Sequence, residues 1–160
     1  MMRQLRQHPL ATAIVTCLAT IALGTLLVGD GLETWYPTLE KPKFLIPLWA
    51  FYLVGVLYYL MFGTVIFRIL TRVEPIRVQR RLLSLAISIM LLNELWNFVF
   101  FGWQSTLAGF VGIVPFLIPL LVLTFQLIRR ERLSGILLVV YCGWVLYDLV
   151  WTYALWQLNS

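Results

Sequence analysis

The sequence predicts an all-α integral membrane protein: one domain over residues 1–160, built as a bundle of five transmembrane helices. Of its 160 residues, 61% are hydrophobic and only 12% are charged, and the mean hydropathy is +0.89. Several apolar stretches have the roughly 20 residues that a helix needs to cross a hydrocarbon core about 30 Å thick. The net charge of +5 does not indicate nucleic-acid binding, because the basic residues form short clusters between these stretches.

The apolar stretches define the spans and one long connection. The first stretch follows Arg3 and Arg6 as a signal peptide would, but it lacks an A-x-A cleavage pattern and is long for one, so we expect a retained helix. Gly24 and Thr25 within it would allow another helix to approach closely. We expect spans at about 10–28, 47–67, 82–101, 107–128 and 134–158, with a long loop at 29–46.

The distribution of basic residues predicts the orientation. With five spans, ten of the twelve Lys and Arg residues fall on the side of the N-terminus, and only Lys41 and Lys43 fall on the other. Cytoplasmic segments carry the excess of positive charge. We therefore expect the N-terminus in the cytoplasm and the C-terminus and the long loop outside, with a bacterial cell membrane as the host membrane.

Polar side chains interrupt the third apolar stretch near its end. One helical face combines two amides with two aromatic rings, at Asn93, Trp96, Asn97 and Phe100. Lipid cannot satisfy an amide, so this face is predicted to point inward. The asparagines either contact a ligand or hydrogen-bond between helices, and the spacing leaves both alternatives open.

Two further stripes are aromatic. The fifth stretch places one carboxylate among rings at helical spacing, in the series Tyr141, Trp144, Asp148, Trp151 and Leu155. The second stretch carries the series Trp49, Tyr52, Val56 and Tyr59, which suits either bundle core or a ligand site. Asp148 and Glu94 lie at similar depth, about 18 to 21 Å from the start of their helices. Two ionised carboxylates in so apolar a setting would repel each other, so we expect at least one to be protonated near neutral pH.

The long loop contains prolines and aromatic residues that suit the membrane interface. Trp35, Tyr36 and Phe44 are accompanied by Pro37 and Pro42. The loop is either a lid over the helix ends or an interfacial connection. No metal or catalytic cluster is predicted, because Cys17 and Cys142 are isolated within apolar stretches and His8 is the only histidine.

Three ordered motifs resemble the TspO/MBR family of tryptophan-rich sensory and translocator proteins. They are WYPTLEKPKFLIPLW at 35–49, LYYLMFG at 57–63 and LNELWNFVFFG at 92–102. The resemblance implies a five-helix bundle, usually a homodimer in the lipid bilayer, with a pocket under the long loop. It implies no required cofactor and, as ligands, tetrapyrroles such as protoporphyrin IX or, in some members, sterols and synthetic molecules.

The resemblance also implies which residues form the pocket. Together with Asp148 from the aromatic stripe, the candidate ligand-binding residues are Tyr36, Trp49, Tyr59, Asn93, Trp96, Trp144 and Trp151, and Trp35 and Pro42 belong to the candidate lid. Gly55 stands where many members have a pocket tryptophan, and Asp148 replaces a small residue. A neutral Asp148 would accept an anionic porphyrin, whereas an ionised one would favour a cationic or neutral ligand.

The sequence favours a ligand-binding membrane receptor or sensor. One alternative is a porphyrin-degrading enzyme, but Gly55 removes one of the two tryptophans that such members use and leaves only Trp144. The other is a transporter, although five spans do not divide into two equal repeats. Sterol binding is not supported, because no basic residue follows the fifth span.

Overall fold

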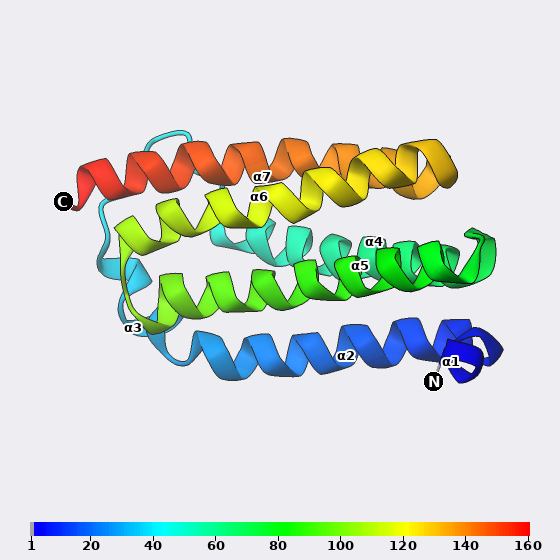
Figure 1. Ribbon diagram of the computed structural model, residues 1–160. Coiled ribbons are helices and arrows are strands. Elements are labelled where there is room, and N and C mark those ends of the chain that lie inside the picture. The colour runs from blue at the N-terminus through cyan, green and yellow to red at the C-terminus, as the bar shows by residue number, and fades with distance from the viewer. Residues whose placement is uncertain (1) are drawn as a thin grey trace.

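The computed structural model describes residues 2–160 and is all-helical, with five long apolar helices that are candidate membrane spans (Figure 1). The predicted fold class is confirmed. The long helices are α2 (Pro9–Val28), α4 (Leu48–Arg72), α5 (Ile76–Asn97), α6 (Thr106–Arg130) and α7 (Arg132–Leu158). The shorter elements are α1 (Met2–Gln7), α3 (Gly31–Thr34), the 3-10 turn η1 (Tyr36–Thr38) and η2 (Phe98–Gly102), a π-helical turn that continues α5.

Local sequence signals account for where the helices begin. Proline precedes the first residue of α4 and of α5, where its fixed φ and missing N–H cost nothing. The side chain of Ser105 caps α6 by accepting from the N–H of Ala108, and that of Glu131 caps α7 by accepting from Ser134. Each of the five long helices extends past its predicted span at one end or both, because hydropathy locates the lipid-facing part of a helix and not its polar ends.

The helices lie alongside one another and form a bundle with two distinct ends (Figure 1). One end, here called the α3 end, carries α3, the long loop and the C-terminus; the opposite end carries the N-terminus and the α4–α5 and α6–α7 connections. α6 and α7 pack along each other, and α2 packs on α4 and α5. The buried core fills the half away from α3 with residues such as Phe62, Ile66, Ile89, Leu120 and Leu138.

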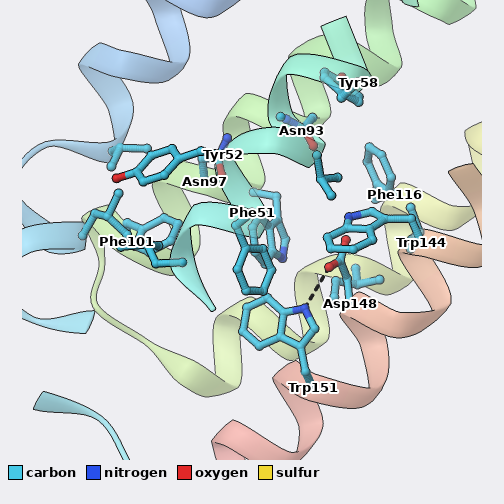
Figure 2. A pocket seen from close by; sticks show the side chains of 18 of the residues that line it. Phe51, Tyr52, Tyr58, Asn93, Asn97, Phe101, Phe116, Trp144, Asp148 and Trp151 are labelled. Carbon is cyan, nitrogen blue, oxygen red and sulfur yellow. Dashed lines mark hydrogen bonds between the residues drawn. The ribbon is translucent and has the colours of Figure 1, made fainter. Parts of the chain in front are cut away.

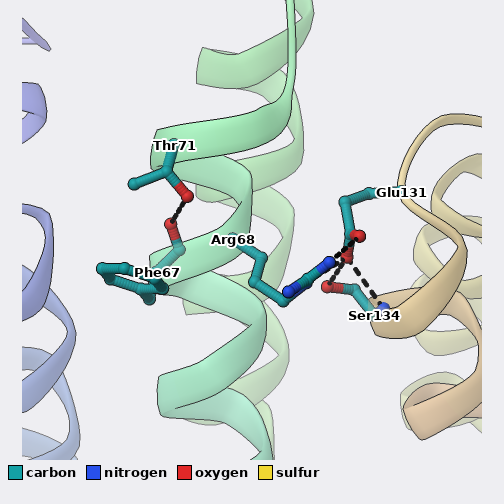
Figure 3. Close-up of polar contacts among 5 residues, drawn as sticks. All are labelled: Phe67, Arg68, Thr71, Glu131 and Ser134. Atoms are coloured by element: carbon teal, nitrogen blue, oxygen red, sulfur yellow. Dashed lines mark hydrogen bonds and ion pairs between the residues drawn. The ribbon is translucent and has the colours of Figure 1, made fainter.

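An ion pair between Arg68 and Glu131, here called the clamp, lies at the end of the bundle opposite α3 (Figure 3). The guanidinium group of Arg68 on α4 donates to both carboxylate oxygens of Glu131, at 2.9 and 2.5 Å. Glu131 also accepts from the backbone N–H of Ser134 at 2.8 Å and from its hydroxyl group. The Arg68 contact, with the Ser134 hydrogen bonds, holds the pKa of Glu131 down at about 2 against the effect of burial. The clamp fixes α4 to the α6–α7 connection.

Candidate ligand-binding site

A cavity of about 310 Å³ opens among the helices in the half of the bundle nearer α3 (Figure 2). All five long helices, α3 and η1 contribute residues to it. Its volume is at the lower end of the range of about 300 to 1,000 Å³ that is typical of small-molecule pockets. The cavity is therefore large enough for a small aromatic molecule.

Aromatic rings form most of the walls. The ring of Phe51 on α4 lies nearly perpendicular to Trp144 and to Trp151 on α7, with centroids 5.8 and 5.5 Å apart. On α5, Trp96 stacks on Phe100 at 5.3 Å, and its indole N–H donates to the carbonyl oxygen of Gly109 at 2.7 Å. Rings held by such contacts present flat faces on which a planar ligand can stack.

Asp148 is the one charged side chain that lines the cavity within the described residues. Its Oδ1 accepts a hydrogen bond of 2.8 Å from the indole N–H of Trp151, one turn further along α7. Figure 2 shows the carboxyl group between the rings of Trp144 and Trp151. No Lys, Arg or His side chain from residues 5–160, whose side chains the structure describes, lines the cavity, so this carboxyl group faces the space without a basic partner among them.

Tyr58 supplies a second polar group. Its side chain is only 6% exposed, lines the cavity from α4, and has a buried hydroxyl group with no hydrogen-bond partner within the described chain. A buried hydroxyl group without a partner is costly, and native proteins rarely contain one without a reason.

Glu94 lies behind the cavity wall and does not line it. It is 1% exposed and accepts from three side chains: the hydroxyl group of Tyr59 at 2.8 Å and the amides of Asn97 and Asn93 at 3.1 and 3.3 Å. Its carboxylate packs against Gly24 of α2, where a Cβ atom would overlap it. Glu94 and Asp148 thus occupy separate environments, one satisfied by the protein and the other open to the cavity.

The long loop covers the α3 end of the cavity and is attached to α7. Tyr36 is buried and packs edge-on against Phe100 and Phe101. The backbone N–H of Ile46 donates to the hydroxyl group of Tyr147 at 3.0 Å, and the amide of Asn159 bonds both backbone groups of Glu40, each at 2.9 Å. Burial, with Tyr147 nearby, raises the pKa of the Tyr36 hydroxyl group, so it stays neutral.

An apolar groove of about 800 Å³ runs along α2 and α4 beside the cavity. The cavity and the groove share four lining residues of α4: Phe51, Tyr52, Gly55 and Tyr59. A Cβ atom added to Gly55 would meet nothing within 4 Å. The glycine therefore leaves open space in the part of α4 that separates the cavity from the groove.

The structure brings together seven of the eight predicted binding residues: Tyr36, Tyr59, Asn93, Trp96, Trp144, Asp148 and Trp151 line one cavity. Trp49 does not join them, because it is 68% exposed in the first turn of α4 and is absent from the cavity wall. Of the predicted lid residues, Trp35 packs edge-on against Phe100, and the carbonyl oxygen of Pro42 accepts from the N–H of Leu45 at 3.0 Å. Whether these residues bind a ligand stays a prediction.

Sequence analysis missed several cavity residues. Phe51 and Tyr58 lie on α4 outside the stripe that was predicted, and Phe116 comes from α6, where no polar side chain drew attention. A stripe over Phe51, Gly55 and Tyr58 has the same helical spacing as the predicted one. Periodicity could therefore have indicated this stripe as a second candidate for the cavity-facing side of α4.

The comparison with known proteins agrees with this arrangement of tryptophan-rich walls under a loop. The family model described as the TspO/MBR family matches residues 13–157, which is most of the chain. The chain belongs to the TspO/MBR family. The prediction from the three motifs is therefore confirmed.

Individual relatives extend over nearly the same length. The tryptophan-rich protein TspO of Archaeoglobus fulgidus is 30% identical over 151 residues, which cover 94% of this chain and 97% of the relative. The protein of the same name from Chlorobaculum tepidum is 33% identical over 151 residues, covering 94% and 95%. Protein CrtK of Rhodobacter capsulatus is 25% identical over 154 residues, covering 93% and 91%.

Proposed function

We propose that the protein is a membrane receptor or sensor that binds a tetrapyrrole of the protoporphyrin IX type, or another flat hydrophobic molecule, in the cavity under the long loop. The observation that carries the proposal is the cavity wall. Phe51, Trp96, Trp144 and Trp151 surround the space with aromatic faces, and Tyr58 also lines it. Such a site suits a planar apolar ligand with few polar groups.

The charges suggest how a porphyrin would be oriented. The ammonium group of Lys41 is engaged, because it donates to the carbonyl oxygens of Tyr36 and Leu39 at 2.8 and 3.1 Å and lies over the Tyr36 ring. Lys43 is exposed in the same loop. Propionate groups would point toward the loop and Lys43, away from the carboxyl group of Asp148.

Absorbance titration with protoporphyrin IX in lipid nanodiscs tests the proposal. We expect saturable binding to the wild type and about tenfold weaker binding to Trp144→Phe and Asn93→Ala, with the bundle still folded. The side-chain amide of Asn93 donates to Glu94, its neighbour on the same helix, so Asn93→Ala removes no hydrogen bond between helices and should fold. Trp49→Phe is the matched control, and its affinity should equal that of the wild type. Absence of saturable binding would reject a tetrapyrrole as the ligand.

We further propose a homodimer in the bilayer, with the N-terminus in the cytoplasm. The basic clusters near the N-terminus and in the α4–α5 and α6–α7 connections lie at one end of the bundle, which supports this orientation (Figure 1). Reporter fusions to the two ends of the chain test the orientation. Chemical cross-linking in native membranes tests the dimer.

A further inference from the structure

We propose that the cavity contains a cation subsite, in which Asp148 and the rings of Phe51, Trp144 and Trp151 bind the protonated amine of a lipophilic aromatic ligand. The inference rests on the proposed function in one respect, namely that the cavity binds a small molecule. It adds the charge of the ligand and the side chains that recognise it.

The first argument is that Asp148 lacks a counter-charge. Among residues 5–160, whose side chains are described, the ion pairs are Arg6 with Glu74 and Arg68 with Glu131, and both lie at the end of the bundle opposite α3. A carboxylate within the membrane is costly unless something compensates it, and ionisable residues there most often serve a function. A bound ammonium group would supply the missing charge.

The second argument is the contrast with Glu94. Three side-chain donors from α4 and α5 satisfy Glu94 inside the protein. The carboxyl group of Asp148 accepts a hydrogen bond from Trp151 at 2.8 Å, has Trp144 as a second indole neighbour, and faces the cavity. Asp148 therefore has acceptor capacity left for a donor that comes from a ligand.

The third argument is the shape of the aromatic walls around this carboxyl group. Phe51 packs at 76° to Trp144 and at 73° to Trp151, and all three rings line the cavity together with Asp148. Cations are attracted to the faces of aromatic rings within about 6 Å, and groups of such rings recognise organic ammonium groups. An anion gains nothing from these faces and is repelled by an ionised Asp148.

Three probes that share one ring system and differ in charge test the proposal. At pH 7, 1-naphthylmethylamine is a cation, 1-naphthalenemethanol is neutral and 1-naphthoate is an anion. Binding is measured by quenching of tryptophan fluorescence in nanodiscs of zwitterionic phosphatidylcholine, and empty nanodiscs correct for partitioning into lipid. For the wild type we expect the amine to bind at least tenfold more tightly than the alcohol, and naphthoate to bind most weakly.

Variants assign the preference to individual groups. Asp148→Asn should bring the affinity for the amine down to that for the alcohol and leave the alcohol within twofold of wild type. Phe51→Leu, which keeps the carboxylate, should weaken amine binding more than alcohol binding. Glu33→Gln removes an exposed carboxylate at the same end of the bundle. It should leave the affinity for the amine relative to the alcohol, and relative to naphthoate, as in the wild type.

Two outcomes would overturn the cation subsite. One is equal affinity of the wild type for the amine and the alcohol, and the other is an equal loss for all three probes in Asp148→Asn. If the alcohol or protoporphyrin IX still binds, only the cation subsite is wrong. If neither protoporphyrin IX nor any naphthalene binds saturably, the proposed function fails as well.

Discussion

The hydroxyl group of Tyr59 on α4 donates a 2.8 Å hydrogen bond to Glu94 on α5, although Tyr59 lines the cavity and Glu94 does not. Asn93 and Asn97 on α5 are two further cavity-lining residues whose side-chain amides donate to Glu94. One buried carboxylate thus holds three polar side chains of the cavity wall in place. Glu94 is a positioning residue, because it acts on a ligand only through these neighbours.

Tyr59→Phe should lower the stability of the bundle. The substitution leaves Glu94 with two of its three side-chain donors, and the loss of an interhelical hydrogen bond in a membrane costs about 0.6 to 2 kcal/mol. Thermal unfolding in detergent, followed by circular dichroism, measures the effect. Tyr52→Phe is the control, because the Tyr52 side chain is 59% exposed. Equal melting temperatures for the two variants would contradict the role of this hydrogen bond.

Gly24→Ala should destabilise the contact between α2 and α5. The added Cβ atom would overlap the carboxylate of Glu94, with only 2.9 Å to its Cδ. Glu94 can move away only by weakening its hydrogen bonds, and overpacking of this kind costs about 1 to 3 kcal/mol. Gly143→Ala on α7, where a Cβ meets nothing within 4 Å, should leave the melting temperature unchanged. The prediction is wrong if both alanine variants melt like the wild type.

The sequence predicted the bundle well because hydropathy over about 20 residues is a strong signal for a membrane helix. The cavity-facing side of α7 was also predictable, since a carboxylate among rings at helical spacing leaves little choice of face. On α4, aromatic residues occur on several faces: Tyr52 and Tyr59 of the stripe through Trp49 line the cavity, whereas Trp49 itself does not. Trp49 and Phe51 are about 200° apart around the helix, so a tryptophan at the membrane interface and a ring in the cavity point in nearly opposite directions.

Other features depend on contacts between distant parts of the chain. Tyr58 and Tyr59 are adjacent, and nothing in the sequence shows that the hydroxyl group of one finds a carboxylate while that of the other has no partner. The attachment of the loop to α7 joins residues more than a hundred positions apart. Such pairings follow from how the helices pack and not from local periodicity.

Pro42→Gly should speed both the association and the dissociation of ligand. Proline restricts the loop backbone beside the turn that its carbonyl oxygen forms with the N–H of Leu45, and glycine would loosen it. Loops that cover a site alter rates more readily than the contacts beneath them. Stopped-flow measurement of protoporphyrin IX binding gives both rates. Pro37→Gly in the same loop is a comparison variant, and unchanged rates for Pro42→Gly would remove the lid role.

Glu131→Gln should lower the stability of the folded protein at neutral pH. It should also remove part of the loss of stability that the wild type shows as the pH falls. The carboxyl pKa falls from 4.5 to about 2 on folding, so its contribution is present above pH 4.5 and is lost as the pH falls toward 2. Loss of the charged hydrogen bonds costs about 1.5 to 3 kcal/mol. Melting temperatures from pH 2 to 7 should converge for wild type and variant at the acid end. Curves that stay parallel over this range would contradict the assignment.

The paired hydrogen bonds between Asn159 and Glu40 make opening of the loop measurable. The side-chain amide of Asn159 bonds both the N–H and the carbonyl oxygen of Glu40, as a neighbouring strand would. The same amide also donates to the carbonyl oxygen of Leu155 in the last turn of α7. Unwinding of that turn would therefore also release the loop at Glu40. Exchange of the Glu40 amide proton with deuterium would report how often this attachment opens, without any ligand present.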